Sequence, residues 1–114
     1  MKKILLVIFS VIGFAICANA DDSAQCKIYG TIDGSTATVS IESYDEQKKE
    51  VTVGFYNDSD HVVTVIAKVK DNGNTTTATA VATVQPRTSI SKTVKWSGER
   101  IPCNISINSA KCQK

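Results

Sequence analysis

The sequence predicts an all-β protein, an antiparallel β-sandwich of about seven short strands with little or no helix. After the first twenty residues, the chain contains no Leu or Met but ten Val, eight Ile and twelve Thr. Residues branched at Cβ are restricted in helices and pack well on a pleated sheet. Apolar and polar residues also alternate in short runs separated by turn-forming residues, which favours two antiparallel sheets packed face to face.

Residues 1–20 have the features of a secretory signal peptide and are expected to lie outside the folded domain. Two lysines precede an apolar run, and Ala18-Asn19-Ala20 places small residues where signal peptidase cleaves. The apolar run is too short for a typical membrane span. We therefore expect a mature chain that starts at Asp21, forms a single domain over residues 21–114 and is secreted or periplasmic.

The charge of the mature chain argues against two classes of partner. Two of the thirteen basic side chains belong to the signal peptide, which leaves eleven basic and eleven acidic side chains. A chain without excess positive charge lacks the electrostatic signature of proteins that bind nucleic acid or anionic membranes. We expect no nucleic-acid partner, and we expect no membrane span because the mature chain has no second long apolar run.

The first two strands are expected to pair directly. Gln25 to Ile32 alternates, with Cys26 in the phase of the core face. Asp33-Gly34 predicts a hairpin turn, because glycine readily adopts the positive φ that tight hairpins require. The second strand covers Thr36 to Ser43. Its core residues are expected to be Ala37, Val39 and Ile41.

The centre of the chain predicts a long hairpin. Val51 to Tyr56 alternates, and the short polar residues Asn57 to Asp60 then form a turn. His61 to Lys70 and Thr75 to Val84 alternate again, on either side of the turn sequence Asp71 to Asn74. The charged connector before this region, residues 44–50, is expected to be a solvent-exposed loop.

Two further strands complete the expected sandwich. Pro86 ends the preceding strand, because proline cannot donate to the hydrogen-bond ladder. The next strand buries three apolar residues, Ile90, Val94 and Trp96, and only Lys92 interrupts this face. The turn Ser97 to Arg100 leads to a last strand from Ile101 to Ile107, with Cys103 in the phase of its core face.

Part of this region is similar to a known class of domain. Four features occur in this order: Val51-Thr52-Val53, Asn57-Asp58-Ser59, the alternating run Val63 to Val69, and Pro86 before Ile90 to Trp96. They resemble secreted immunoglobulin-like β-sandwich modules of the CARDB and FxLYD type, although Arg87 replaces the glycine expected after Pro86. The resemblance covers about half of the mature chain and implies an adhesion or accessory module without catalytic residues to carry over.

Three cysteines follow the signal peptide, and export permits disulfides. Cys26 and Cys103 lie in phase with the core faces of the first and last expected strands, so we favour a bridge between them. Cys112 would then be free or would form a disulfide-linked dimer with a second chain. The alternative pairs Cys26 with Cys112 and leaves Cys103 as a buried small hydrophobic residue.

Three asparagines satisfy the glycosylation sequon, namely Asn57, Asn74 and Asn104. Asn57 and Asn74 fall in expected turns, and Asn104 is out of phase with the core face, so all three are possible glycosylation sites. Coincidence is the alternative, because Ser and Thr are common in this chain. A bacterial host would usually leave all three unmodified.

The sequence offers little for catalysis. His61 is the only histidine, so neither a metal cluster nor a histidine-based catalytic site can be assembled from recognisable spacing. We interpret His61 as an exposed strand residue and Asp58 and Asp60 as turn-forming carboxylates. We expect no enzymatic activity, no cofactor and no metal.

Binding is the favoured function. Tyr29 and Tyr56 fall on expected outer faces and would form a ligand surface if they lay close together, whereas Trp96 belongs to the core. The sequence thus predicts a small secreted binding or adhesion module for a protein or glycan at or outside the cell surface. The alternative is a secreted hydrolase inhibitor that blocks an active site with the loop 71–76.

Overall fold

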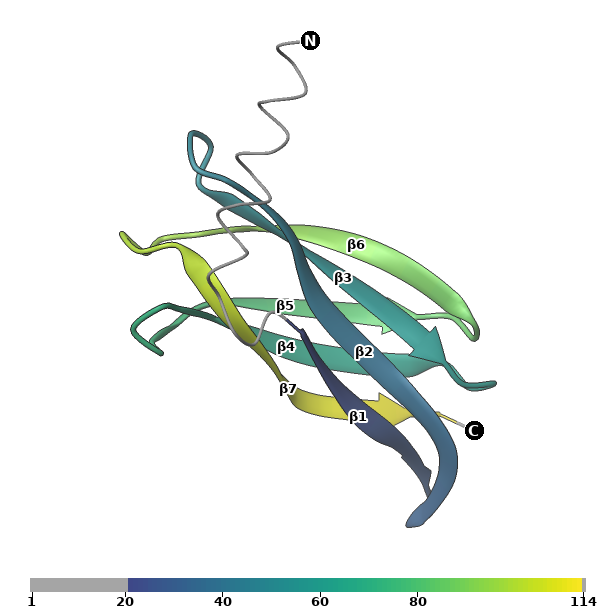
Figure 1. Ribbon diagram of the computed structural model, residues 1–114. Coiled ribbons are helices and arrows are strands. Elements are labelled where there is room, and N and C mark those ends of the chain that lie inside the picture. The colour runs from purple at the N-terminus through teal and green to yellow at the C-terminus, as the bar shows by residue number, and fades with distance from the viewer. Residues whose placement is uncertain (1–20, 114) are drawn as a thin grey trace, which may run out of the picture.

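The computed structural model describes residues 21–113, which fold into two antiparallel sheets packed face to face (Figure 1). No helix occurs in this range, and therefore none that could cross a membrane. The expected signal peptide lies outside the described residues. The strands are β1 (Asp21–Ile28), β2 (Thr31–Asp45), β3 (Glu50–Asp58), β4 (Val63–Asp71), β5 (Thr76–Val84), β6 (Thr88–Lys95) and β7 (Pro102–Cys112).

The strand order confirms the predicted immunoglobulin-like sandwich. One sheet has the order β1-β2-β3-β6 and the other β5-β4-β7. The chain crosses between sheets after β3, β5 and β6, so β3 pairs with β6 and β4 pairs with β7. In immunoglobulin domains strand B pairs with strand E in one sheet, and strand C pairs with strand F in the other. The pair β3–β6 corresponds to B–E, and the pair β4–β7 corresponds to C–F. The expected direct pairing of β1 with β2 is also confirmed.

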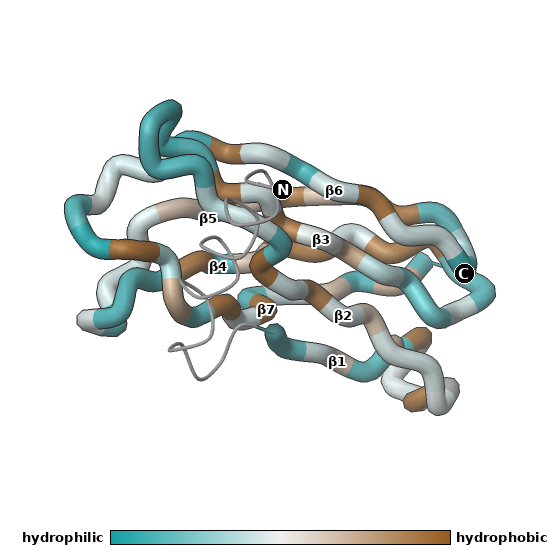
Figure 2. The backbone as a smooth tube through the Cα atoms, turned by 45° about the horizontal axis from the view of Figure 1, so that its top comes forward, coloured by the Kyte–Doolittle hydropathy of each residue, from teal (hydrophilic) through white to brown (hydrophobic). Residues whose placement is uncertain are grey.

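Alternation along the central strands forms the core, as predicted. Every second residue of β4 and β5 is buried, and the hydropathy of the backbone alternates accordingly (Figure 2). The polar turn between β2 and β3 is hydrophilic in the same view. The buried cluster contains Ala37, Val39, Ile41, Val51, Val53, Phe55, Val63, Val65, Ala67, Val69, Ala78, Ala80, Ala82, Val84, Trp96 and Ile105.

Trp96 closes the core at the end of the sandwich opposite the β1–β2 turn. Its side chain is 2% exposed, and Tyr44 packs against it edge to face with ring centroids 6.2 Å apart. The indole nitrogen donates to the carbonyl of Arg100 at 2.8 Å, so the polar atom of this large ring is satisfied. The interpretation of Trp96 as a core residue is confirmed.

The turn of the first hairpin is not where the sequence predicted it. Tyr29 and Gly30 form the turn, with φ values of 54° and 82°. Asp33 and Gly34 lie inside β2, where the pairing with β1 is irregular, and the φ of Gly34 is 86°. A bulge uses a left-handed glycine as readily as a turn does. The Asp33-Gly34 pair therefore correctly predicted a glycine with positive φ, but this glycine lies in a bulge and not in the hairpin turn.

The turn of the central hairpin lies where expected but uses a different residue for the left-handed conformation. Asn74, with φ of 69°, takes this role in place of the expected Asn72-Gly73 pair. A carboxylate oxygen of Asp71 accepts hydrogen bonds from the backbone N–H groups of Gly73 and Thr75, at 2.8 and 3.0 Å. The loop is thus braced from within.

Irregular pairing in β7 overturns the predicted core position of Cys103, whereas Ile105 and Ile107 face the core as predicted. Its register against β4 shifts twice, so neither Cys103 nor Asn108 has a regular partner in β4. Each bulge moves the following residues to the opposite face. Cys103 is consequently only half-buried, whereas Cys112 packs against the core cluster.

Candidate binding surface at one end of the sandwich

All seven strands begin or end near one end of the molecule, which we call the hairpin end. It contains the β1–β2 turn, the connections 59–62 and 85–87, and the end of β7 (Figure 1). Sandwich domains cluster their loops at two such ends, and loops on a rigid scaffold commonly carry binding residues. The hairpin end is therefore the first place to look for a binding surface.

The β1–β2 hairpin extends beyond the rest of its sheet at this end (Figure 1). The pairing of β2 with β3 begins at Thr36, so residues 31–35 of β2 lie next to β1 alone. Opposite them, β1 contributes only residues 26–28, because the bulge in β2 takes up the difference, and three residues of strand span roughly 10 Å at about 3.3 Å per residue. The tip of the hairpin is thus presented well away from the body of the sandwich.

Tyr29 sits at this tip in a conformation that tyrosine rarely adopts. Both turn residues have positive φ, as in a type I′ turn, whose first position favours Asn, Asp or Gly. The left-handed region is sterically unfavourable for a residue with a bulky side chain. Yet the Tyr29 side chain is 85% exposed, and Ile32 on the returning strand is 49% exposed. The hairpin displays apolar surface at a conformational cost.

A disulfide between Cys26 and Cys112 anchors the base of this hairpin. The two Cα atoms lie 5.7 Å apart, and the bridge joins β1 of one sheet to β7 of the other. The favoured Cys26–Cys103 pairing is therefore wrong, because Cys103 lies at the start of β7, beyond the contact of Ile107 with Asp22, whereas Cys112 lies at the end of β7 beside Cys26. The alternative pairing is confirmed, and Cys112 has no thiol for the expected disulfide-linked dimer. Cys103 is a free cysteine.

A second tie holds β1 against β7. A carboxylate oxygen of Asp22 accepts a hydrogen bond from the backbone N–H of Ile107 at 2.8 Å. A carboxylate that accepts a backbone N–H makes a charge-assisted hydrogen bond, which is stronger than a neutral one. The hairpin is therefore fixed to the second sheet both near its base and near the start of β1.

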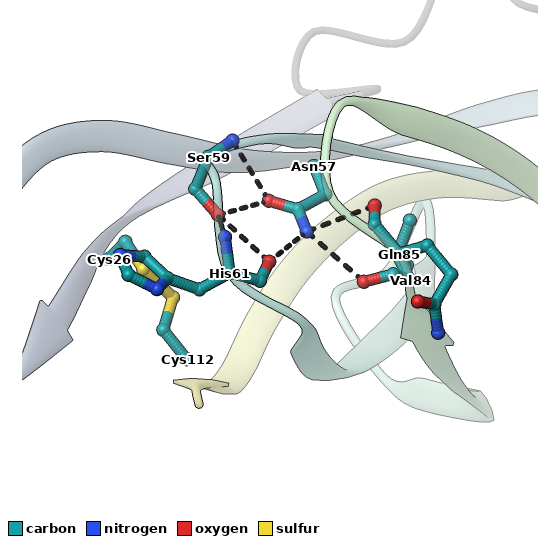
Figure 3. The surroundings of a disulfide bond; sticks show 7 residues. All are labelled: Cys26, Asn57, Ser59, His61, Val84, Gln85 and Cys112. Carbon is teal, nitrogen blue, oxygen red and sulfur yellow. Dashed lines mark hydrogen bonds between the residues drawn. A yellow bond between two sulfur atoms is a disulfide. The ribbon is translucent and has the colours of Figure 1, made fainter. Parts of the chain in front are cut away.

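Asn57 organises the corner between β3 and β4 beside the bridge (Figure 3). Its amide nitrogen donates to the carbonyls of His61, Val84 and Gln85, at 2.6, 3.1 and 3.1 Å. Its amide oxygen accepts from the backbone N–H and the hydroxyl of Ser59, at 3.1 and 2.6 Å. One side chain thus satisfies polar groups from both connections at the hairpin end.

The burial of Asn57 removes one of the three expected glycosylation sites. Asn57 is 1% exposed and its amide nitrogen is fully engaged, so the expectation that it is accessible is wrong. Asn74 is exposed at the tip of the opposite hairpin, and Asn104 is half-buried in β7. Glycosylation of these two residues remains a prediction.

Arg87 forms a charged cluster at the edge of the same end. Its guanidinium pairs with a carboxylate oxygen of Asp58 at 3.0 Å and of Asp60 at 3.2 Å. The hydrogen bond and the charge of Asp60, followed by the charge of Asp58, raise the pKa of Arg87. Arg87 also has a positive φ of 54°, a backbone conformation that favours glycine. Both carboxylates are thus paired with the guanidinium of Arg87.

The two tyrosines expected to form a ligand surface do not lie together. Tyr56, 43% exposed on β3, pairs with Thr38 of β2, which pairs with Ser23 of β1. Tyr29 follows six residues after Ser23, so the tyrosines are separated by roughly 20 Å along the strands. Tyr56 instead belongs to the Arg87 cluster, because its hydroxyl lies 3.5 Å from Asp58.

His61 lies in the bend before β4, not in a strand as expected, and is half-buried. Its side chain points toward the disulfide (Figure 3). Over residues 21–113, no three His, Cys, Asp or Glu side chains gather in a group that could hold a metal ion.

Models of known protein families, curated proteins and solved structures give no match to this chain. A functional conclusion must therefore come from the geometry of the hairpin end.

Proposed function

We propose that this protein is a small exported binding module that recognises a protein or glycan at or outside the cell surface, without catalysis. The recognition surface is the tip of the β1–β2 hairpin. The observation that carries the proposal is Tyr29, which is 85% exposed in a left-handed conformation. Backbone strain of this kind concentrates at binding sites, where the surrounding structure tolerates its cost.

The chemistry of the tip suits recognition. Tyrosine offers a large rigid ring and a polar hydroxyl at low entropic cost, and it is enriched among residues that dominate binding energy. Ile32 adds apolar area beside it. The disulfide at Cys26 lies only three residues from Tyr29, so the tip is held in place before a partner arrives. Pre-organisation of this kind reduces the entropy lost on binding.

A secreted hydrolase inhibitor is the second candidate. The observation that favours it is the loop 72–75 at the opposite end, which the Asp71 carboxylate braces through two backbone hydrogen bonds. A rigid projecting loop can enter an active-site cleft with little loss of entropy. The two candidates use opposite ends of the molecule, so variants at each end distinguish them.

Replacing Tyr29 with asparagine is expected to weaken retention on washed cells of the producing organism by at least about tenfold, since removing a central aromatic anchor typically costs more than 1 kcal/mol. The measurement is the bound fraction of fluorescently labelled, disulfide-intact protein as a function of concentration. Asn72→Lys, at the exposed tip of the opposite hairpin, serves as the matched control and should bind as the unmodified protein does.

The same pair of variants tests the inhibitor. Capture from the native medium of one stoichiometric hydrolase that Asn72→Lys releases and Tyr29→Asn retains would contradict recognition through the β1–β2 tip and support inhibition instead.

A further inference from the structure

The four edge strands of the sandwich, β1, β5, β6 and β7, are protected to different degrees against pairing with a strand of another molecule. An exposed edge presents unpaired backbone groups to any passing strand, and proteins block such edges with charges, bulges or covering segments. β1 and β7 lie against each other and are joined by the disulfide and by the Asp22 carboxylate. β6 carries Lys92 in the phase of its core-facing residues Ile90 and Val94, which is a known protective device.

β5 has none of these features over most of its length. Thr76–Val84 contains no charged residue and no proline, and its pairing with β4 is regular from Ala78 to Val84. Val81, on the outer face, is 52% exposed beside Ile66 of β4. Neutral strands of alternating small and β-branched residues fit readily against another strand.

One part of this edge is covered within the same chain. The loop after β6 approaches the start of β5, where a Cβ added to Gly98 would stand 3.0 Å from the Thr77 side chain. At the other end of β5, the carbonyl of Val84 accepts a hydrogen bond from the Asn57 amide, so the edge that can accept a partner runs from Ala78 to Thr83.

We propose that this edge pairs with β5 of a second copy of the chain, antiparallel about a two-fold axis at Val81. This register places the two Val81 side chains opposite each other, and Thr79 opposite Thr83. The outward-facing residues of both copies therefore lie on one face of the joined sheet and the core-facing residues on the other. Opposed β-branched and threonine pairs are favourable across strands. The pairing joins two three-stranded sheets into one of six strands, with an interface closed by its own symmetry.

Charge makes a second copy the fitting occupant. A two-fold axis places identical residues near each other, so charged residues on the edge would repel their own copies. The segment 78–83 has none, and the mature chain has equal numbers of acidic and basic side chains. Two copies thus approach without net repulsion.

The test is sedimentation velocity of residues 21–114 with the Cys26–Cys112 bridge intact, from about 1 to 500 µM. A Cys103→Ser background excludes dimers linked through the free thiol. We expect the mass to double as concentration rises. Val81→Lys should weaken dimerisation more than about tenfold, because two like charges would then face each other. Ser89→Lys on the exposed, already protected β6 edge is the control and should leave dimerisation unchanged.

A monomer across the whole range would overturn the proposal, as would equal effects of the two lysine variants. The register is tested by Val81→Cys in the same background, which should cross-link two copies under mild oxidation. Cross-linking by Ser89→Cys to the same extent would contradict pairing through β5.

Discussion

Replacing Cys112 with serine is expected to lower the free energy of unfolding by about 3–5 kcal/mol, a large share of the about 5–15 kcal/mol that stabilises a typical domain. The bridge joins residues 86 positions apart in sequence and so closes nearly the whole of residues 21–113. Cross-linking so long a loop restricts the unfolded chain strongly. Loss of the bridge also frees the base of the β1–β2 hairpin from the second sheet.

The measurement is chemical denaturation of residues 21–114 and of two matched variants. Cys103→Ser leaves the bridge intact and should change the unfolding free energy far less than Cys112→Ser does. Peptide mapping without reductant should find the Cys26–Cys112 linkage. If Cys103→Ser were the more damaging change and mapping placed Cys26 with Cys103, the assigned register of β7 would be wrong.

Replacing Asn57 with alanine is expected to cost about 3 kcal/mol. The change removes both amide groups of a side chain that is 1% exposed. The carbonyls of Val84 and Gln85 and the backbone N–H of Ser59 would lose their hydrogen bonds to Asn57 at the corner. Each buried polar group left without a partner costs about 1–3 kcal/mol.

Asn57→Asp distinguishes hydrogen bonding from packing. The aspartate has the same shape, but it replaces a donor with an acceptor that would face three carbonyl oxygens. We expect it to be at least as destabilising as alanine at pH 7. Asn108→Ala, at an exposed position of β7, should change stability by less than about 0.5 kcal/mol. Equal stability of Asn57→Asp and the unmodified protein would show that the amide donor has no such role.

The fold could be predicted because the central strands obey a simple alternation. The core-facing residues of β4 are Val63, Val65, Ala67 and Val69. The alternation of apolar and polar residues within this one strand is enough to identify them. Trp96 could be assigned to the core for the same reason. These inferences need only local sequence, since a strand with one buried face repeats every two residues.

Bulges explain what the sequence did not reveal. A bulge adds one residue to one strand only, and its position depends on the partner strand rather than on local sequence. The bulge at Asn108 turns Cys112 toward the core, and the tertiary position of β7 places Cys112 rather than Cys103 beside Cys26. The left-handed glycine at Gly34 served a bulge rather than a turn, so the true turn at Tyr29 was missed.

The candidate site was only partly foreseeable. Tyr29 was recognised as an exposed aromatic residue, but its strained position at an overhanging tip depends on how far β3 extends beside β2. The Arg87 cluster joins Asp58 at the end of β3 and Asp60 in the next connection to Arg87 in the connection 85–87, and only the tertiary fold brings these segments together. Asn57 had a local signal, a polar residue at a strand end with a serine two positions later, but the signal was interpreted as a possible glycan site.

The most direct test of recognition through the hairpin tip is to measure stability and binding together for Tyr29→Asn. Asparagine tolerates the left-handed turn better than tyrosine, so the free energy of unfolding should rise by about 0.5–1 kcal/mol. Retention on cells should fall at least about tenfold in the same preparation. A variant that is more stable and binds as well as the unmodified protein would contradict the account, because the strain at Tyr29 would then serve no recognition.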